Sequence, residues 1–346
     1  MATADVTVHG AGIFGLSIAW ACVKRGARVR VIDPLGPGGG TSGGVVGALA
    51  PHVPERWNEK KAFQFESLIM AESFWREIDG LSGMSSGYDR KGRLQPIADE
   101  NALNLARTRT AGAAKLWQGK ADWRICPVES FPHWAPESPT GQVIYDTLTA
   151  RIHPRQACAS LARALVKQGA EVVHDGPSQG LAIWATGTAG LHELSAQLEK
   201  PVGNGVKGQA ALIAFDARDM PQLFADSVHI VPHADGTTAI GSTSERDFDA
   251  PDTTDDLLED VMARAFSVCP AMAELRVLER WAGVRPRARS RAPMLGAYPG
   301  RLGQFIANGG FKIGFGMAPK VGEVMADLVL DGNDTIPPGF RVEDNL

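Results

Sequence analysis

Four arginines stand at alternate positions of the stretch WAGVRPRARSRAP: Arg285, Arg287, Arg289 and Arg291. A guanidinium holds a carboxylate or phosphate through two parallel hydrogen bonds, so this stretch is suited to binding an anion. The whole chain, however, has 35 basic and 39 acidic residues and a net charge of −4. Such a charge gives no general attraction to nucleic acid or anionic lipid, and the arginines must therefore act locally.

A second chemical signature opens the chain, where Gly10, Gly12 and Gly15 have the GxGxxG spacing and Asp33 follows. Such glycines permit a tight turn, let a pyrophosphate approach the backbone, and let a helix pack closely on a sheet. The helix N-terminus then stabilises the phosphate charge, and the acid accepts hydrogen bonds from ribose hydroxyls. An acid at this position disfavours NADP. The motif alone leaves both FAD and NAD open.

The glycine-rich loop that follows favours FAD. Seven glycines lie between Gly36 and Gly47, with Thr41 and Ser42 among them. Such a loop has little side-chain bulk and many backbone donors, which suits it to wrapping a long cofactor. A flexible linker is the alternative, but a solvated linker would not need the apolar residues of VVGALA at the end of the loop.

Metal and membrane chemistry find little support in the sequence. The four cysteines form no CxxC pair, which argues against a disulfide framework or a zinc site. His229 and His233 are four residues apart, but Pro232 and a strand pattern argue against a helical metal site, and we predict no metal. No signal peptide or long apolar run is visible, so we expect a cytoplasmic protein without a membrane span.

Alternating strands and helices must position these groups. We expect the opening motif to lie on a strand, the helix 13–24 and a second strand ending at Asp33. Asp235-Gly236 predicts the turn of a hairpin within 228–246. Further helices are expected over 59–78, 101–116, 154–169, 257–266 and 319–330, and further strands over 170–173, 181–184 and 305–307.

Taken in order, these motifs resemble the FAD-dependent D-amino acid oxidase superfamily (the DAO family), closest to its glycine oxidase and sarcosine oxidase-like enzymes. The similarity spans nearly the whole chain. The matching motifs are GAGIFG with VID, TSGGVVGALAP, IHP, WATG, VKGQ, VPHADGTTAIGSTSE, GVRP with PMLG, and GGFKIGFGMAP.

The resemblance implies an α/β fold. A Rossmann-type FAD-binding domain of the glutathione reductase kind is interleaved with a substrate domain built on a mainly antiparallel β-sheet. The FAD-binding segments would be 1–50, 145–200 and 280–335. The substrate domain would comprise 51–144 and 201–279, and 336–346 would form a C-terminal tail.

The resemblance also implies non-covalent FAD, since no cysteine follows Cys269 for a covalent link. The backbone of the GGFKIG segment would lie near the flavin ring, and the helix after it would direct its N-terminus at the carbonyl edge of the ring. The cofactor-binding residues would be Gly10, Gly12, Ile13, Phe14, Gly15, Asp33, Thr41, Ser42, Gly43, Gly47, Ala48, Val173, Ala185, Thr186, Gly187, Arg285, Gly309, Gly310, Phe311, Lys312 and Ile313.

The implied reaction is oxidation of the carbon–nitrogen bond of an amino acid or secondary amine such as glycine, sarcosine, a D-amino acid or an N-substituted glycine. The α-hydrogen passes as hydride to flavin, the imine hydrolyses, and O2 or another acceptor takes the electrons. Arg285 would clamp the substrate carboxylate, and Lys312 would be a flavin or oxygen partner unless it is a plain surface lysine. His52 would face the active site or be a structural histidine.

Two departures from the family pattern point to a larger or more acidic substrate. Ser290 replaces an acidic residue common after GxRP, and the chain has only three tyrosines to provide an aromatic hydroxyl. An enzyme that oxidises a carboxymethylaminomethyl group of tRNA is the first alternative, although we expect no partner methyltransferase domain and the charge argues against nucleic acid. A non-enzymatic FAD-binding protein is the second alternative. The sequence leaves open whether the protein forms a homo-oligomer.

Overall fold

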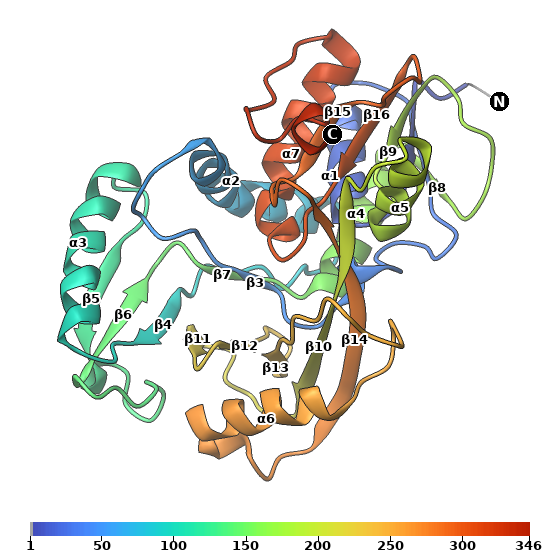
Figure 1. Cartoon of the computed structure of the whole chain (residues 1–346). Helices are drawn as coiled ribbons and strands as arrows, with labels where there is room; N and C mark the ends of the chain where they lie inside the picture. Colours follow the sequence, from blue (N-terminus) through green and yellow to red (C-terminus); the bar gives the residue numbers. More distant parts are fainter. Residues whose placement is uncertain (1–2) are drawn as a thin grey trace.

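The computed structural model describes residues 3–346 and contains two main sheets (Figure 1). The first has six strands in the order β15-β16-β9-β1-β2-β8, of which five are parallel and the edge strand β15 runs antiparallel to β16. Its strands are β1 (Val6–His9), β2 (Val29–Ile32), β8 (Glu171–Val173), β9 (Leu181–Trp184), β15 (Met294–Ala297) and β16 (Gln304–Asn308).

Helix α1 (Ile13–Lys24) connects β1 to β2 and has the bounds that the sequence predicts. Its residues are apolar on all sides because it packs against the sheet, against α4 (Pro154–Lys167) and against α7 (Gly314–Asp331). Helix α2 (Glu59–Ser82) packs in turn on α4 and α7. The opening strand–turn–helix is therefore held on one side by the sheet and on the other by a layer of helices.

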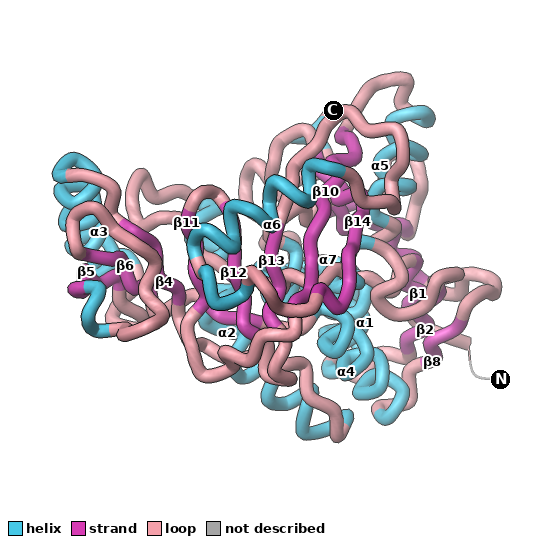
Figure 2. Tube along the Cα trace, turned by 90° about the horizontal axis from the view of Figure 1, so that it is seen from below, coloured by secondary structure: helices cyan, strands magenta, loops and turns pink. Residues whose placement is uncertain are grey.

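The second sheet has eight strands in the order β14-β10-β13-β12-β11-β4-β6-β5, and all its pairs are antiparallel except β4 with β11. Figure 2 shows the β14 to β11 end of this sheet with α6 (Asp256–Val268) lying across its face. The strands are β4 (Arg93–Pro96), β5 (Trp123–Pro127), β6 (Gln142–Asp146), β10 (Gly203–Ile213), β11 (Gln222–Ala225), β12 (Val228–Pro232), β13 (Thr238–Gly241) and β14 (Val277–Ala288).

Strands β10 and β14 are the longest pair of the molecule and run between its two halves (Figure 1). They contact α5 (Gly187–Gln197) of the first half, while β10 also contacts α6 of the second. The α/β architecture with a mainly antiparallel second sheet is the one expected. The domain boundaries stay a prediction, and both β6 and β14 run across predicted boundaries, at 145 and 280.

The remaining elements are short or peripheral. Helix α3 (Glu100–Leu116) packs beside β5. A two-stranded sheet pairs β3 (Ala48–Leu49) with β7 (Ala150–Arg151). Four single turns of 3-10 helix complete the chain: η1 (Thr41–Gly43), η2 (Val128–Ser130), η3 (Pro270–Met272) and η4 (Glu343–Asn345). Throughout residues 3–346, no helix combines the length and apolarity needed to cross a membrane.

The prediction that the last helix begins at Pro319 is wrong, because α7 begins at Gly314. Proline favours the first turn of a helix, where its missing N–H is not needed. Here Pro319 lies inside the helix, and the next backbone N–H, of Lys320, donates to the Ser67 hydroxyl at 3.3 Å. Because α7 begins at Gly314, its N-terminus directly follows the GGFKI segment.

Candidate active site

The glycine turn after β1 is too crowded for larger residues. Gly10 has a φ of +104°, and a Cβ atom there would overlap the carbonyl oxygen of Ala185. A Cβ atom on Gly15 would overlap the carbonyl oxygen of Gly10, so this glycine lets α1 lie directly against the turn. The WATG segment packs against this turn, and the N–H of Ala185 donates to the backbone carbonyl of His9 at 2.7 Å.

The N-terminus of α1 is arranged to receive an anion. Gly12 provides no capping side chain and the first turn contains no acid, so the helix dipole is not neutralised from within the helix. Ser42 reaches this turn from the glycine-rich loop and accepts the N–H of Ile13 at 3.0 Å. The Asp33 carboxylate lies beside it and accepts the N–H of Ala11 at 2.7 Å.

These features fit FAD. The glycine turn gives a pyrophosphate access to backbone, the helix N-terminus and Ser42 offer donors, and Asp33 offers a carboxylate to ribose. The structure thus brings together predicted cofactor residues from three separate segments: 10–15, Asp33 and 41–43.

The glycine-rich loop is held from several directions rather than solvated. Arg155 of α4 donates to the carbonyl of Gly43 at 2.6 Å, and the His233 ring lies 2.8 Å from the carbonyl of Val45. Gly47 has a φ of +68°, and a Cβ atom there would overlap the carbonyl of Ile152. The linker interpretation is therefore excluded for this loop.

Asn308, which sequence analysis did not select, joins two more of the predicted cofactor segments. Its side-chain N–H donates to the carbonyl of Gly187 at 2.8 Å, and its side-chain oxygen accepts the N–H of Gly309 at 2.8 Å. Asn308 is nearly fully buried. The sequence could have indicated Asn308 through its position, since it is a polar residue at the end of a predicted strand and directly precedes Gly309 and Gly310.

Arg285 lies on β14 with its guanidinium above Gly208 of β10. A Cβ atom on Gly208 would overlap the guanidinium, so glycine here makes the room that Arg285 occupies. The guanidinium donates to the Ser242 hydroxyl at 2.8 Å and to the carbonyl of Thr243 at 3.3 Å. Desolvation lowers the pKa of Arg285 to about 10, opposed by the charge of Glu245, so Arg285 remains a cation at neutral pH.

The segment after Asn308 comes close to Arg285. Phe311 has a φ of +45° and donates its N–H to the carbonyl of Pro286 at 3.0 Å. The next residue, Lys312, is exposed, and desolvation together with the charge of Arg285 lowers the pKa of Lys312. The two predicted catalytic cations therefore lie near each other.

His229 is a buried histidine near the predicted site that the sequence did not single out for this site. Its ring packs on Phe224 with centroids 4.5 Å apart, and its Nδ1 is buried without a hydrogen-bond partner in the described chain. Desolvation, followed by the charges of Arg93 and Lys312, lowers the pKa of His229 to about 3. The imidazole is thus neutral and lies within reach of the charge of Lys312. No local spacing could have shown this, because His229 and Lys312 are far apart in the sequence.

His52 has a different environment. Its backbone N–H donates to the Gln64 side chain of α2 at 2.7 Å, and its ring contacts the same amide oxygen. Desolvation lowers the pKa of His52, with a raising contribution from Gln64 and lowering ones from Lys60 and Lys61. These partners favour the structural role, and an active-site role for His52 stays a prediction.

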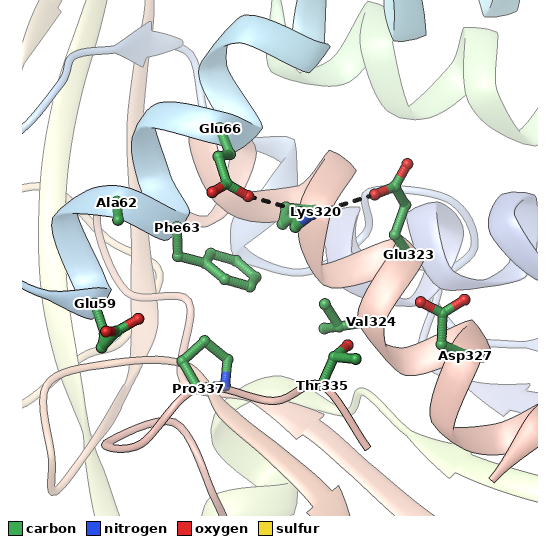
Figure 3. A pocket seen from close by; sticks show the side chains of 10 residues that line it. All are labelled: Glu59, Ala62, Phe63, Glu66, Lys320, Glu323, Val324, Asp327, Thr335 and Pro337. Atoms are coloured by element: carbon green, nitrogen blue, oxygen red, sulfur yellow. Dashed lines mark ion pairs between the residues drawn. The ribbon is translucent and has the colours of Figure 1, made fainter. Parts of the chain in front are cut away.

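A hollow of about 360 Å³ between α2 and α7 holds none of the predicted site residues (Figure 3). Lys320 lies between Glu66 at 3.3 Å and Glu323 at 3.6 Å, and Asp327 pairs with Arg25. Three of its acids are thus paired within the protein. Over residues 3–346, no three side chains of His, Cys, Asp or Glu gather as metal ligands.

Comparison with known proteins gives consistent matches. The family model described as FAD dependent oxidoreductase matches residues 5–328. Glycine oxidase of Bacillus licheniformis is 25% identical, over 94% of this chain and 93% of the relative. The crystal structure of glycine oxidase from Geobacillus kaustophilus superposes with a TM-score of 0.82 and 20% identity, covering 98% of each chain. Iminodiacetate oxidase from Chelativorans sp. BNC1 has a TM-score of 0.81 and 21% identity, covering 97% of this chain and 98% of the other.

Proposed function

Because this chain belongs to the family of FAD dependent oxidoreductases, we propose that it oxidises the carbon–nitrogen bond of an amino acid or a secondary amine. The substrate would carry a carboxylate, as glycine, sarcosine, a D-amino acid or an N-substituted glycine does. Its product would be an imine that water hydrolyses. The relative from Bacillus licheniformis, named glycine oxidase, supports this substrate class.

The environment of Arg285 is the observation that carries the proposal. Its guanidinium is bonded only to a hydroxyl and a carbonyl, and no acid lies within 4 Å of it in residues 3–346. A largely desolvated cation without a counter-ion favours binding of an anion. The planar guanidinium would hold a carboxylate through two parallel hydrogen bonds.

The other residues would position the cofactor and the amine. FAD supplies, when bound, the acceptor for the two electrons and the hydrogen that leave the carbon–nitrogen bond. The segments 10–15, 41–48, 185–187 and 309–313 would hold it, with Asp33 on the ribose. A substrate amine that arrives neutral needs no protein base. Binding and orientation would be the main task of the site.

Anaerobic mixing with amines tests the proposal. Protein reconstituted with FAD should show a yellow flavin spectrum that glycine, sarcosine, D-alanine or an N-substituted glycine bleaches and that air restores. The Arg285→Ala protein should keep the spectrum and lose the bleaching. If FAD binds and no carboxylate-bearing amine bleaches it, the proposed substrate class is wrong; if FAD does not bind, the cofactor assignment fails as well.

A further inference from the structure

Two cations lie close to the ring of Phe311 next to the Arg285 site. The guanidinium of Arg287 lies 5.8 Å from the ring centroid, and the ammonium of Lys312 lies 5.7 Å from it. Within residues 3–346, neither cation has an acidic partner within 4 Å. The positive φ of Phe311 and the hydrogen bond from its N–H to the carbonyl of Pro286 fix the backbone of Phe311 beside β14.

More positive charge surrounds this pair. Desolvation, and then the charges of Arg291 and Arg246, lower the pKa of Arg287. Lys60 donates to the carbonyl of Arg291, and desolvation and the charge of Arg291 lower the pKa of Lys60. Like charges gathered in this way repel one another, which is a cost that binding sites commonly accept.

The acids around β14 are paired with other cations. Lys207 of β10 is paired with Glu245 at 3.6 Å and with Asp255 at 3.1 Å. At the far end of β14, Arg280 is paired with Glu259 and Glu279 with Arg155. Ion pairs thus neutralise the half of β14 that lies away from the site. The half with Arg285 and Arg287 has no such partner in the described chain.

From this distribution we infer that the substrate carries two anionic groups. Arg285 takes the carboxylate next to the reacting amine, and Arg287 with Lys312 takes a second carboxylate or a phosphate-type group. This inference rests on the proposed function and narrows it to dianionic amines. A substrate with a single anionic group on Arg285 would leave the positive charges of Arg287 and Lys312 without a partner. A polyanion such as RNA is less favoured, because the chain has a net charge of −4.

Equilibrium binding of two unreactive analogues tests the inference on the FAD-loaded protein. Methoxyacetate carries one carboxylate, and diglycolate has the same ether skeleton with a carboxylate at both ends. Charge-assisted hydrogen bonds to a second anion should make diglycolate bind about tenfold more tightly. Phosphonomethoxyacetate forms a third arm, which separates a phosphate-type group from a carboxylate. Calorimetry or the shift of the flavin absorbance reports the dissociation constants.

The Arg287→Gln variant should reduce the preference for diglycolate to within about threefold and leave methoxyacetate unchanged. Lys312→Gln is a second variant, should Arg287→Gln fold poorly. Arg289→Gln is the matched control: Arg289 is exposed, donates to the carbonyl of Leu346, and should leave both affinities unchanged.

Three outcomes would overturn the inference. Equal affinity for the two analogues, or an equal loss of both in Arg287→Gln, would show that no second anion site exists; if amines still bleach the flavin, the proposed function survives. Absence of binding by every analogue together with absence of bleaching would overturn both. Salt-sensitive binding of tRNA without a preference for diglycolate would identify the cations as a nucleic-acid surface.

Discussion

The guanidinium of Arg285 owes its position to neighbours that carry no charge. Gly208 leaves the space, while Ser242 and Thr243 accept hydrogen bonds from it without neutralising it. The cation is thereby held in a fixed orientation while its charge stays available to a ligand. Lysine could supply the charge at this position but not the planar pair of donors.

Arg285→Lys tests the importance of that geometry. We expect kcat/KM for the best amine to fall by about 10- to 100-fold, mainly through KM, because one or two charge-assisted hydrogen bonds to the carboxylate are lost. The flavin spectrum should not change. Steady-state kinetics provide the measurement, with Arg289→Lys as the control. Wild-type kinetics in Arg285→Lys would contradict a two-pronged contact.

His233 makes the stability depend on pH. It is fully buried between the loop carbonyl of Val45 and the ring of His153, near Arg151 and Asp235. Desolvation is the main cause that lowers the pKa of His233 to about 4, and Val45 and Asp235 oppose it. The unfolded chain takes up its proton near the ordinary value of 6.5. Stability is therefore full above pH 6.5 and falls as the pH drops towards 4.

Replacing His233 by glutamine should flatten this dependence. Between pH 7 and pH 4.5 the wild type should lose about 2 kcal/mol more unfolding free energy than His233→Gln, because only the wild type has this histidine to protonate on unfolding. Urea unfolding at the two pH values measures the difference. Parallel losses in the two proteins would mean that His233 does not titrate as inferred.

At the scale of elements, the pairing of β10 with β14 builds the proposed substrate side of the site. The antiparallel register sets Val206 opposite Arg285 and Gly208 opposite Gly283, so two glycines face each other two pairs away from the arginine. Pro286 stays within the strand because β14 is at the edge of its sheet. Arg289 and Arg291 lie beyond the end of β14, and alternation along the strand therefore cannot align all four arginines.

Gly208→Ala should disable the site without unfolding the sheet. The added methyl would displace the guanidinium of Arg285, a flexible group that can move, so we expect the kcat/KM loss to approach that of Arg285→Ala. The double variant should be hardly worse than either single one, because both remove the same contact. Kinetics and circular dichroism provide the test. Gly80→Ala is the control, since a Cβ atom there has open space; additive losses would refute the shared mechanism.

At the scale of the whole molecule, the cofactor site is assembled from segments spread along nearly the entire chain. The predicted FAD contacts come from residues 10–48, 173–187 and 309–313, and the structure joins them through contacts such as Asn308 to Gly187 and Asp33 to Val173. A ligand that bridges these segments stabilises the folded state as a unit, because the unfolded chain offers no such site.

FAD should therefore raise the melting temperature of the apoprotein. At about 100 times its dissociation constant, FAD should add about 3 kcal/mol, which corresponds to a rise of about 5 °C for a chain of this size. NADP should produce no comparable rise, because Asp33 disfavours a 2′-phosphate. Differential scanning fluorimetry against ligand concentration makes the measurement. A melting temperature independent of FAD would contradict the site.

The sequence by itself determined the local features whose causes are local. The glycine turn with helix 13–24 and the hairpin turn at Asp235-Gly236 follow from residue types a few positions apart. The α/β class and the FAD cofactor follow from the order of the motifs along the chain and the family that they resemble. Only the tertiary structure decided which cations lack partners, why Gly208 must be small, and that the ring of His229 is buried without a partner for its Nδ1 in the described chain. These properties depend on the register and packing of strands that are far apart in sequence. The residue spacing within a single segment does not encode them.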